Sequence, residues 1–188
     1  MICGSPKDQN VPMVMEGFKD VIGQYNNTVL DEYYCDGWKA ELASEYVYSH
    51  LNYIEQADAI MCGNDDLASK VVFALSEKRL AGKKLVVGQD ADLEACQRIV
   101  EGTQLMTVYK PIEKLAQKAA EAAVHMAKGE VIDDPGLSEY DDGSTKIPYL
   151  KIEPVSVTKE NIDDVIINSG FHLKEDVYLN VPSKMPGN

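Results

Sequence analysis

Short apolar runs alternate with longer segments in which apolar residues recur at helical spacing over the first two thirds of the chain. Runs of about four to eight apolar or β-branched residues are typical of buried strands, whereas a period of three to four residues is typical of helices. The predicted strands lie at 1–4, 28–34, 59–62, 84–87 and 105–109, and the predicted helices at 11–25, 40–54, 67–75 and 93–100. This alternation predicts an α/β fold, a Rossmann-like three-layer sandwich in which helices cover both faces of a parallel β-sheet.

The last third of the chain departs from this alternation. Pro111 is placed to start a helix, and Gly129 is placed to end it. The apolar stripe of this helix consists of Ile112, Leu115, Ala119, Ala122, Ala123 and Met126. The elements expected after it are an acidic loop over 133–143, a strand with two prolines over 147–157, a short helix over 161–168 and a loosely ordered tail over 174–188.

The net charge and the shortness of the apolar runs disfavour two classes of protein, nucleic-acid binders and membrane-spanning proteins. The 18 Lys and Arg residues against 31 Asp and Glu residues give a formal net charge of −13 at pH 7. A surface this acidic repels phosphate backbones, so we expect no nucleic-acid partner. Apolar runs stay well short of the roughly 20 residues of a transmembrane helix, and no basic segment opens the chain at Met1. Neither a membrane span nor a signal peptide is therefore predicted in this chain.

Four cysteines, Cys3, Cys35, Cys62 and Cys96, form no C-x-x-C pair. Their spacing gives no zinc or redox signature, and two of them lie in apolar strand-like runs. We therefore interpret them as buried free thiols that behave as small apolar side chains. Such thiols favour a reducing setting, either the cytosol or the exterior of an anaerobe.

Polar residues follow the predicted strands at their carboxyl ends, where ligands bind in open parallel sheets. The candidate ligand-binding residues at these ends are Asp8 and Asn10, then Asp36, Gly37 and Trp38, then Asn64 and Asp65, then Gln89 and Asp90, and finally Lys110. Carboxylates and amides suit the hydroxyls of a sugar, a lysine donates to a ring or hydroxyl oxygen, and a tryptophan suits the apolar face of a sugar. The alternative is that Asp and Asn cap helices and form turns here, which explains each of them individually.

Motifs for other chemistry do not occur in the sequence. It contains no G-x-G-x-x-G after the first strand, no P-loop, no H-E-x-x-H and no G-x-S-x-G. Asp65 and Asp66 suit the first turn of a helix better than a pair of acid–base carboxylates, and the acidic run after residue 132 lacks the spacing of an EF-hand loop. We therefore predict no enzymatic activity, no cofactor and no metal site.

Five segments close to the strand ends resemble the D-xylose-binding proteins of sugar ABC transporters, which are type I periplasmic binding proteins. They are CGSPKDQN at 3–10, DGWK at 36–39, GND at 63–65, GQDADL at 88–93 and GTQLMTVYKPI at 102–112. The resemblance covers about residues 1–173. The GQDAD and TVYKPI stretches are its most specific parts.

The resemblance implies a protein of two lobes that holds a pentose between them, and this chain resembles the C-terminal lobe alone. It implies that six of the residues at the strand ends contact the sugar: Asp8, Asn10, Trp38, Asn64, Asp90 and Lys110. Trp38 would stack on the sugar face, and Lys110, at a hinge crossing, would bond a hydroxyl or the ring oxygen. The residues that would bond hydroxyls are Asp8, Asn10, Asn64 and Asp90.

The resemblance also implies partners and a division of the chain. The parts are a sugar-binding lobe at 1–110, a hinge-crossing helix and acidic loop at 111–146, and a returning strand, short helix and tail at 147–188. The implied partners are D-xylose or a similar monosaccharide and the permease of an ABC transporter, at a periplasmic or extracellular cell-surface location. With one lobe missing, we expect weak or undetectable sugar binding and self-association through the unpartnered helix at 112–128.

Two other functions fit the same fold. One is a sugar-sensing component that presents its ligand to a membrane histidine kinase or a chemoreceptor. The other is the effector domain of a repressor-type regulator. A regulator needs a helix-turn-helix and a basic surface, which the net charge of −13 disfavours. Transport and sensing stay open as alternatives at this point.

Overall fold

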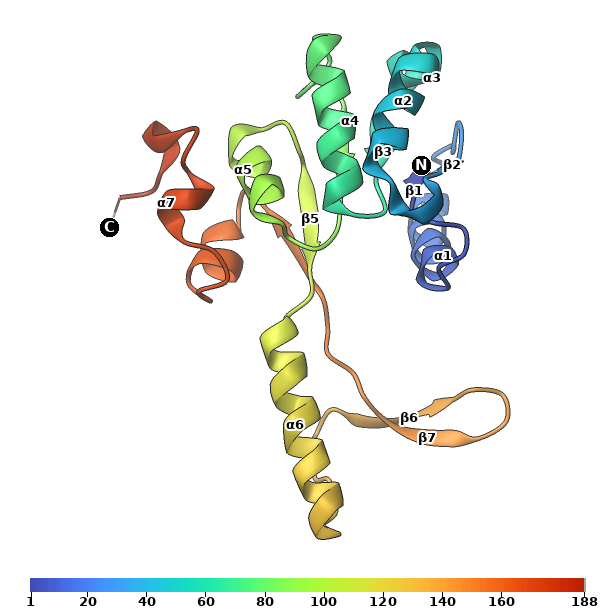
Figure 1. Cartoon of the computed structure of the whole chain (residues 1–188), viewed down its shortest axis with the longest axis vertical. Coiled ribbons are helices and arrows are strands. Elements are labelled where there is room, and N and C mark those ends of the chain that lie inside the picture. The colour runs from blue at the N-terminus through green and yellow to red at the C-terminus, as the bar shows by residue number, and fades with distance from the viewer. Residues whose placement is uncertain (188) are drawn as a thin grey trace. The chain divides into compact units, whose positions relative to one another are not determined.

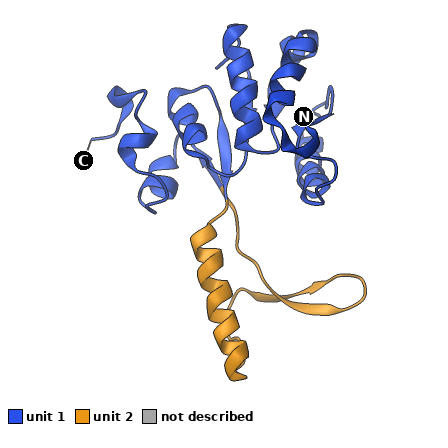
Figure 2. Ribbon diagram, in the orientation of Figure 1, with its two compact units in different colours: residues 1–109, 156–188 blue, residues 110–155 orange. Residues whose placement is uncertain are grey.

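Two units make up the chain, and Figure 2 colours them separately. The computed structural model describes residues 1–187. Unit 1 contains residues 1–109 and the chain from 156 onward, and unit 2 contains residues 110–155. The three-part division expected from the sequence, at 110 and 146, stays a prediction.

Short strands form the sheet of unit 1 (Figure 1). They are β1 (Ile2–Cys3), β2 (Tyr33–Tyr34), β3 (Ala59–Met61), β4 (Leu85–Val87), β5 (Met106–Tyr109) and β8 (Val155–Thr158). β1 pairs with β2, β3 with β4 and β4 with β5, each in parallel, and β8 adjoins β5. A parallel bridge between Ile2 and Cys62 joins the two groups of strands. The carboxyl ends of β1 to β5 therefore meet along one edge.

Helices cover both faces of this sheet, as predicted. They are α1 (Asn10–Gly23), α2 (Ala40–Ser49), α3 (Leu51–Gln56), α4 (Asp65–Glu77) and α5 (Leu93–Glu101). Val11 and Met15 of α1 form a small buried cluster with Cys3, whereas Ile2 belongs to the main core with α2 and α4. Because successive strand residues point to opposite faces, α1 covers one face and α2 and α4 the other. The predicted fold class, α/β with a parallel sheet, is confirmed.

The main core lies between the sheet and the neighbouring helices α2 and α4 (Figure 1). Ala43 and Val47 on α2 are fully buried, as are Leu67, Val71 and Leu75 on α4. These are the stripes that the helical spacing predicts. Burial of each larger apolar side chain contributes roughly 1.5–3 kcal/mol to the free energy of folding. The two helices therefore stabilise the fold by shielding this face of the sheet from water.

The four cysteines are buried free thiols, as predicted. Burial raises the pKa of Cys3 and Cys35 to about 11 and that of Cys96 to about 12. The thiols therefore stay protonated at neutral pH and pack as apolar groups.

Two predicted elements of unit 1 are shorter than expected. The strand predicted over 28–34 is reduced to β2, because only its last two residues reach the pairing partner β1. The helix predicted over 40–54 is interrupted at His50, whose φ of −122° and ψ of 35° leave the helical range. The apolar stripe continues across the break, which is why the spacing alone predicts one helix.

Unit 2 contains α6 (Ile112–Lys128) and a hairpin of β6 (Leu137–Asp141) and β7 (Lys146–Leu150). As predicted, α6 begins after Pro111 and ends at Gly129, which takes the left-handed conformation with a φ of 70°. Among residues 1–187, no helix is long and apolar enough to span a membrane.

The hairpin corrects two expectations. The acidic loop expected over 133–143 contains β6, which pairs in antiparallel fashion with β7. A turn closes the hairpin, because Oδ1 of Asp142 accepts from the backbone N–H groups of Ser144 and Thr145 at 2.8 and 2.7 Å. The single strand expected over 147–157 is split into β7 and β8, with Pro154 in the irregular segment between them.

The C-terminal tail is folded, which corrects the expectation of a loosely ordered segment. α7 (Lys174–Val177) packs against α5, and Val177 is fully buried. Nζ of Lys184 donates to the carbonyl oxygens of Val100 and Glu101 at 3.1 and 3.0 Å. The tail therefore completes the core of unit 1 beside α5. The other short elements are η1 (Asp36–Trp38), η2 (Asp163–Ile167) and η3 (Pro182–Lys184).

Replacing the buried tail residue tests this packing. Val177→Ala should lower the free energy of unfolding by about 1–3 kcal/mol, because it removes two buried methyl groups and leaves a cavity. Urea denaturation followed by circular dichroism measures the change. Leu179→Ala is the matched control, because Leu179 is 66% exposed and should change stability by less than about 0.5 kcal/mol. Equal effects of the two variants would contradict a packed tail.

Candidate ligand-binding site

Three of the six predicted residues meet at the carboxyl ends of β1 and β2. Nε1 of Trp38 donates to Oδ2 of Asp8 at 3.1 Å, although the two residues are 30 positions apart. Oδ1 of Asp8 accepts from the backbone N–H and the side-chain amide of Asn10 at 2.9 and 3.1 Å. The Asn10 N–H, together with the Trp38 indole and the Asn10 amide, holds the pKa of Asp8 below its usual value. The carboxylate is therefore ionised at neutral pH and accepts hydrogen bonds only.

Two glycines make room for the indole ring of Trp38. A Cβ atom on Gly4 would lie 2.1 Å from the ring, and one on Gly63 would lie 3.3 Å from it. Gly4 follows β1 and Gly63 lies just beyond β3, so the ring lies across the ends of two neighbouring strands. Trp38 itself has a φ of 58°, a conformation that costs a bulky residue roughly 1–3 kcal/mol. The surrounding contacts therefore fix the ring in a place its backbone does not favour.

Asn64 follows Gly63 in the turn after β3. Its side-chain oxygen accepts from the N–H of Leu67 at 3.0 Å and so caps α4. The capping interpretation therefore holds for the oxygen of Asn64. A side-chain amide also carries two N–H donors, and the cap does not use them. Capping and ligand binding are thus compatible at this residue.

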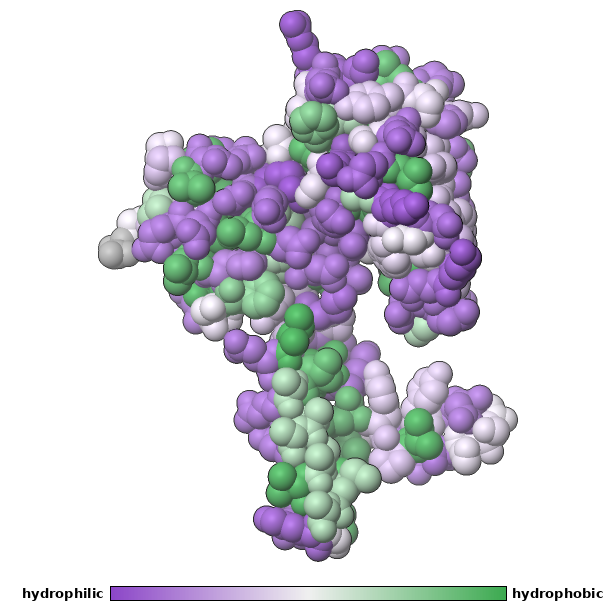
Figure 3. Space-filling model, viewed as in Figure 1, coloured by the Kyte–Doolittle hydropathy of each residue, from purple (hydrophilic) through white to green (hydrophobic). Residues whose placement is uncertain are grey.

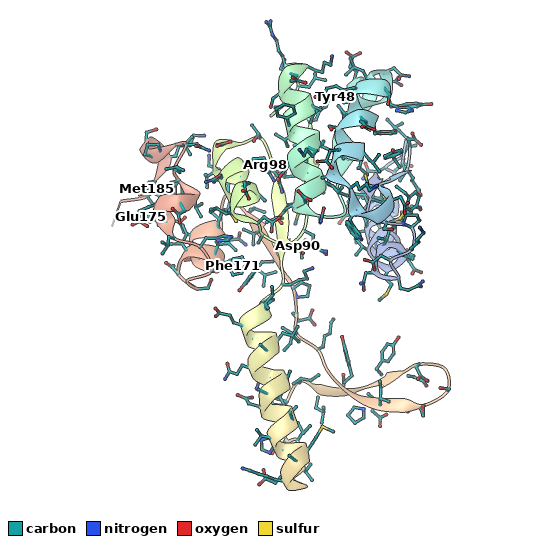
Figure 4. The ribbon with its side chains drawn as sticks, in the orientation of Figure 1. Tyr48, Asp90, Arg98, Phe171, Glu175 and Met185 are labelled. Carbon is teal, nitrogen blue, oxygen red and sulfur yellow. The ribbon has the colours of Figure 1, made fainter. Side chains whose placement is uncertain are left out.

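Asp90 lies in the turn between β4 and α5, where Figure 4 labels it. Its φ is 111°, and that of Ala91 is 58°, so two consecutive residues that are not glycine occupy unfavourable conformations. The N–H of Asp90 donates to the carbonyl of Val108 at 2.9 Å. Nε2 of His172 lies 2.8 Å from the carbonyl oxygen of Ala91 and donates to it, since a carbonyl only accepts. The strained turn is therefore held from two sides.

A buried carboxylate, Asp65, connects the turns after β3 and β4. The sequence places it at a strand end and in the first turn of a helix, but it does not predict that the side chain is buried. Its side chain is fully buried. Oδ1 accepts from Nε2 of Gln104 at 2.9 Å, and Oδ2 accepts from Oγ1 of Thr107 at 2.6 Å and from the N–H of Asp92 at 3.1 Å. Burial raises the pKa of Asp65 to about 6, and these hydrogen bonds oppose the rise. At neutral pH the group is mostly ionised.

One signal in the sequence points to this network. Thr107 is a polar residue at a buried position of β5, and a buried hydroxyl requires a partner. The strand pattern reveals the position of Thr107 but not its partner, which is 42 residues away.

The structure brings five of the six predicted residues to neighbouring strand ends. Hydrogen bonds join Asp8, Asn10 and Trp38, and a bond of 2.8 Å from the N–H of Asp65 to the carbonyl of Gln89 links the turn of Asn64 to that of Asp90. Lys110 directly follows β5 and is the first residue of unit 2. Its position relative to the other five stays a prediction. An aromatic face flanked by carboxylates and amides suits a small ring that carries hydroxyls.

Comparison with known proteins agrees with this architecture. The profile of the periplasmic binding protein domain family matches residues 1–131. The D-xylose-binding periplasmic protein of Haemophilus influenzae is 40% identical over 180 residues, which are 93% of this chain and 54% of that protein. The protein of the same name from Escherichia coli is 36% identical over 179 residues, again 93% of this chain and 54% of the relative.

A solved structure shows the same fold. The ABC transporter solute-binding protein from Clostridium phytofermentans, with bound β-D-glucose, superposes with a TM-score of 0.74 at 24% identity. The match covers 94% of this chain and 59% of that one. The chain therefore belongs to the periplasmic binding protein domain family and spans about half the length of the relatives it matches. The resemblance to the D-xylose-binding proteins is confirmed.

Enlarging Gly4 tests the position of Trp38. Gly4→Ala should displace the ring, because the new Cβ would lie 2.1 Å from it. Since Trp38 is the one tryptophan in the sequence, its emission should shift to longer wavelength as the ring becomes hydrated. Gly17→Ala is the control: that Cβ meets nothing within 4 Å, and alanine should stabilise α1 by up to about 1 kcal/mol. Unchanged emission in Gly4→Ala would show that the ring is not seated on Gly4.

Proposed function

We propose that this chain is a sugar-binding lobe of an ABC-transporter solute-binding protein, that its ligand is D-xylose or a similar pentose, and that it is not an enzyme. The observation that carries the proposal is the indole of Trp38, lying across the ends of β1 and β3 and anchored by Asp8. Relatives named for D-xylose support the class of ligand.

The proposed contacts follow from the chemistry of each group. The face of Trp38 covers the C–H groups of the sugar, and the ionised Asp8 accepts from hydroxyls. Asn10 and Asn64 supply amide donors, and Asp90 accepts from hydroxyls at the neighbouring strand end. Lys110 donates to a hydroxyl or to the ring oxygen. Each role is that of a contact residue in a half-site.

Affinity should be low for this lobe alone. Relatives are about twice as long, and the chain covers 54% of each of the two D-xylose-binding proteins. A sugar on a single lobe keeps its other face in water, so the lobe gains roughly half of the contacts and no closure. In the complete protein we propose that the sugar is delivered to a transporter permease on the outer side of the cytoplasmic membrane.

Titration with D-xylose tests the proposal. We expect weak, saturable binding at millimolar sugar that changes the emission of Trp38. Asp90→Ala should weaken binding by about tenfold or more, since it removes charge-assisted hydrogen bonds. Asp58→Ala is the matched control, because Asp58 is an exposed carboxylate at the opposite, amino end of β3. Binding that persists unchanged in Asp90→Ala would place the sugar elsewhere, and the absence of any Trp38 response would argue against the half-site.

We also propose that α6 associates with a second copy of the chain. None of its side chains is buried within the chain, and Ile112, Leu115 and Met126 are 59%, 54% and 71% exposed. Figure 3 shows apolar residues gathered along this helix. A continuous apolar band of this kind usually marks an interface. An isologous helix pair buries the same band on both copies.

Sedimentation velocity over micromolar concentrations tests the association. We expect a dimer in the unaltered chain and a monomer after Leu115→Glu, because a charge in the apolar interface is desolvated without a partner. Gln117→Glu introduces the same charge on the same helix, at an exposed polar residue, and should leave the dimer intact. Sedimentation of the unaltered chain as a monomer would refute self-association.

A further inference from the structure

The carboxylate of Asp65 is bonded by three separate parts of unit 1. Thr107 on β5 donates to it at 2.6 Å, Gln104 in the segment before β5 at 2.9 Å, and the N–H of Asp92 before α5 at 3.1 Å. The backbone N–H of Asp65 donates to the carbonyl of Gln89 at 2.8 Å. One fully buried residue therefore connects the start of α4, the turn after β4 and β5.

The hydroxyl of Thr107 extends this contact to the strained turn. It donates to Oδ2 of Asp65 and accepts from the N–H of Ala91 at 3.1 Å. A backbone N–H can only donate, so the hydroxyl proton must point at the carboxylate. The acceptor that holds Ala91 is therefore oriented by the charge of Asp65.

Gln104 has a fixed orientation in the same network. Nε of Arg98 donates to Oε1 of Gln104 at 2.9 Å. A guanidinium has no acceptor, so the amide of Gln104 must present Nε2 to Asp65. The space around Oδ1 of Asp65 is also limited, since a Cβ atom on Gly88 would lie 2.1 Å from that oxygen. Every donor and acceptor in this network thus has one assigned direction.

We propose that Asp65 is a positioning residue for sugar binding. It holds the turn of Asp90 and Ala91 in its strained conformation and so fixes the position of Asp90 relative to Asn64. The inference rests on the proposed function, because its consequence for affinity requires that Asp90 contact the sugar. Asp65 itself is fully buried, so it acts through the turn and not by contact. The alternative is that Asp65 serves only the start of α4, as a negative charge at a helix N-terminus.

A pair of substitutions separates these roles. Asp65→Asn places an amide N–H₂ group in the position of Oδ1 or of Oδ2. At Oδ1 it faces Nε2 of Gln104, and at Oδ2 it faces the N–H of Asp92, so two donors meet in either orientation. Gln104→Glu added to it restores complementarity at position 65, since the new carboxylate accepts from Arg98 and from the amide there. It gives up the bond of 3.2 Å from Nε2 of Gln104 to the carbonyl of Met106. The double variant also keeps the net charge of the unaltered chain. Asp66→Asn, at the exposed neighbour in the first turn of α4, is the matched control.

Two readouts are measured on each variant: D-xylose affinity from Trp38 fluorescence, and hydrogen exchange of the Ala91 and Asp92 amides by NMR without sugar. Asp65→Asn should weaken binding by about tenfold or more and speed exchange at both amides. The double variant should recover both values in part, because the amide at position 65 regains an acceptor while the carbonyl of Met106 loses its donor from position 104. Asp66→Asn should change neither.

A second substitution covers the case in which Asp65→Asn does not fold. Thr107→Val removes the hydroxyl while nearly keeping the volume, so it leaves the Ala91 N–H without its acceptor. Thr107→Ser keeps the hydroxyl. We expect faster exchange at Ala91 and weaker binding in Thr107→Val, and values near those of the unaltered chain in Thr107→Ser.

The two proposals fail in different ways. If the unaltered chain shows no response to D-xylose, the proposed function fails, and the exchange rates alone decide whether Asp65 fixes the turn. Exchange at Ala91 and Asp92 that is unchanged by Asp65→Asn would overturn the positioning role, whether or not sugar binds. A double variant as impaired as Asp65→Asn would overturn it as well.

Discussion

The requirement that a buried carboxylate be surrounded by donors organises the ligand edge of this sheet. Removing Asp65 from water is costly, which is why its pKa rises to about 6 even with three hydrogen bonds to its oxygens. The three donors lie in the turn after β4, in the segment after α5 and on β5, so satisfying the carboxylate brings these segments into one arrangement with the turn after β3. The same arrangement places Asn64 and Asp90 on adjacent strand ends. Under the positioning role proposed for Asp65, a charge in the core determines the geometry at the surface.

The position of the Trp38 ring is set by the shape of its surroundings. The indole lies where Gly4 and Gly63 leave space, and the bond from Nε1 to Asp8 fixes its rotation. Trp38, Asp90 and Ala91 all have positive φ values, and such conformations persist only where the surroundings determine them. Strain thus occurs on both sides of the proposed site, and each strained residue has an identified restraint. Preorganised contacts of this kind reduce the entropy lost when a ligand binds.

Local patterns in the sequence predict the parts of the structure that depend on periodicity and on strand ends. The stripes of α2 and α4 are buried as expected, and Asp8, Trp38, Asn64 and Asp90 follow from the rule that parallel strands share a carboxyl edge. Features that depend on distant partners are not predictable in this way. Asp65 is bonded by residues 39 and 42 positions later, and the tail is bonded by residues 83 and 84 positions earlier. The hairpin of unit 2 is missed for a different reason, because its acidic composition hides the pairing of β6 with β7.

The weak sugar binding proposed for this chain does not require that the contact residues be displaced. The bond from Trp38 to Asp8 and the bonds that join Thr107 and His172 to Ala91 lie within unit 1. Exclusion of water depends on a second lobe, because a sugar on this edge keeps its outer hydroxyls hydrated. Under the proposed function, orientation and affinity are therefore separable: the lobe would orient the sugar, and a covering surface would be needed for affinity. The apolar band of α6 is exposed within unit 2, and it is the surface proposed above for self-association.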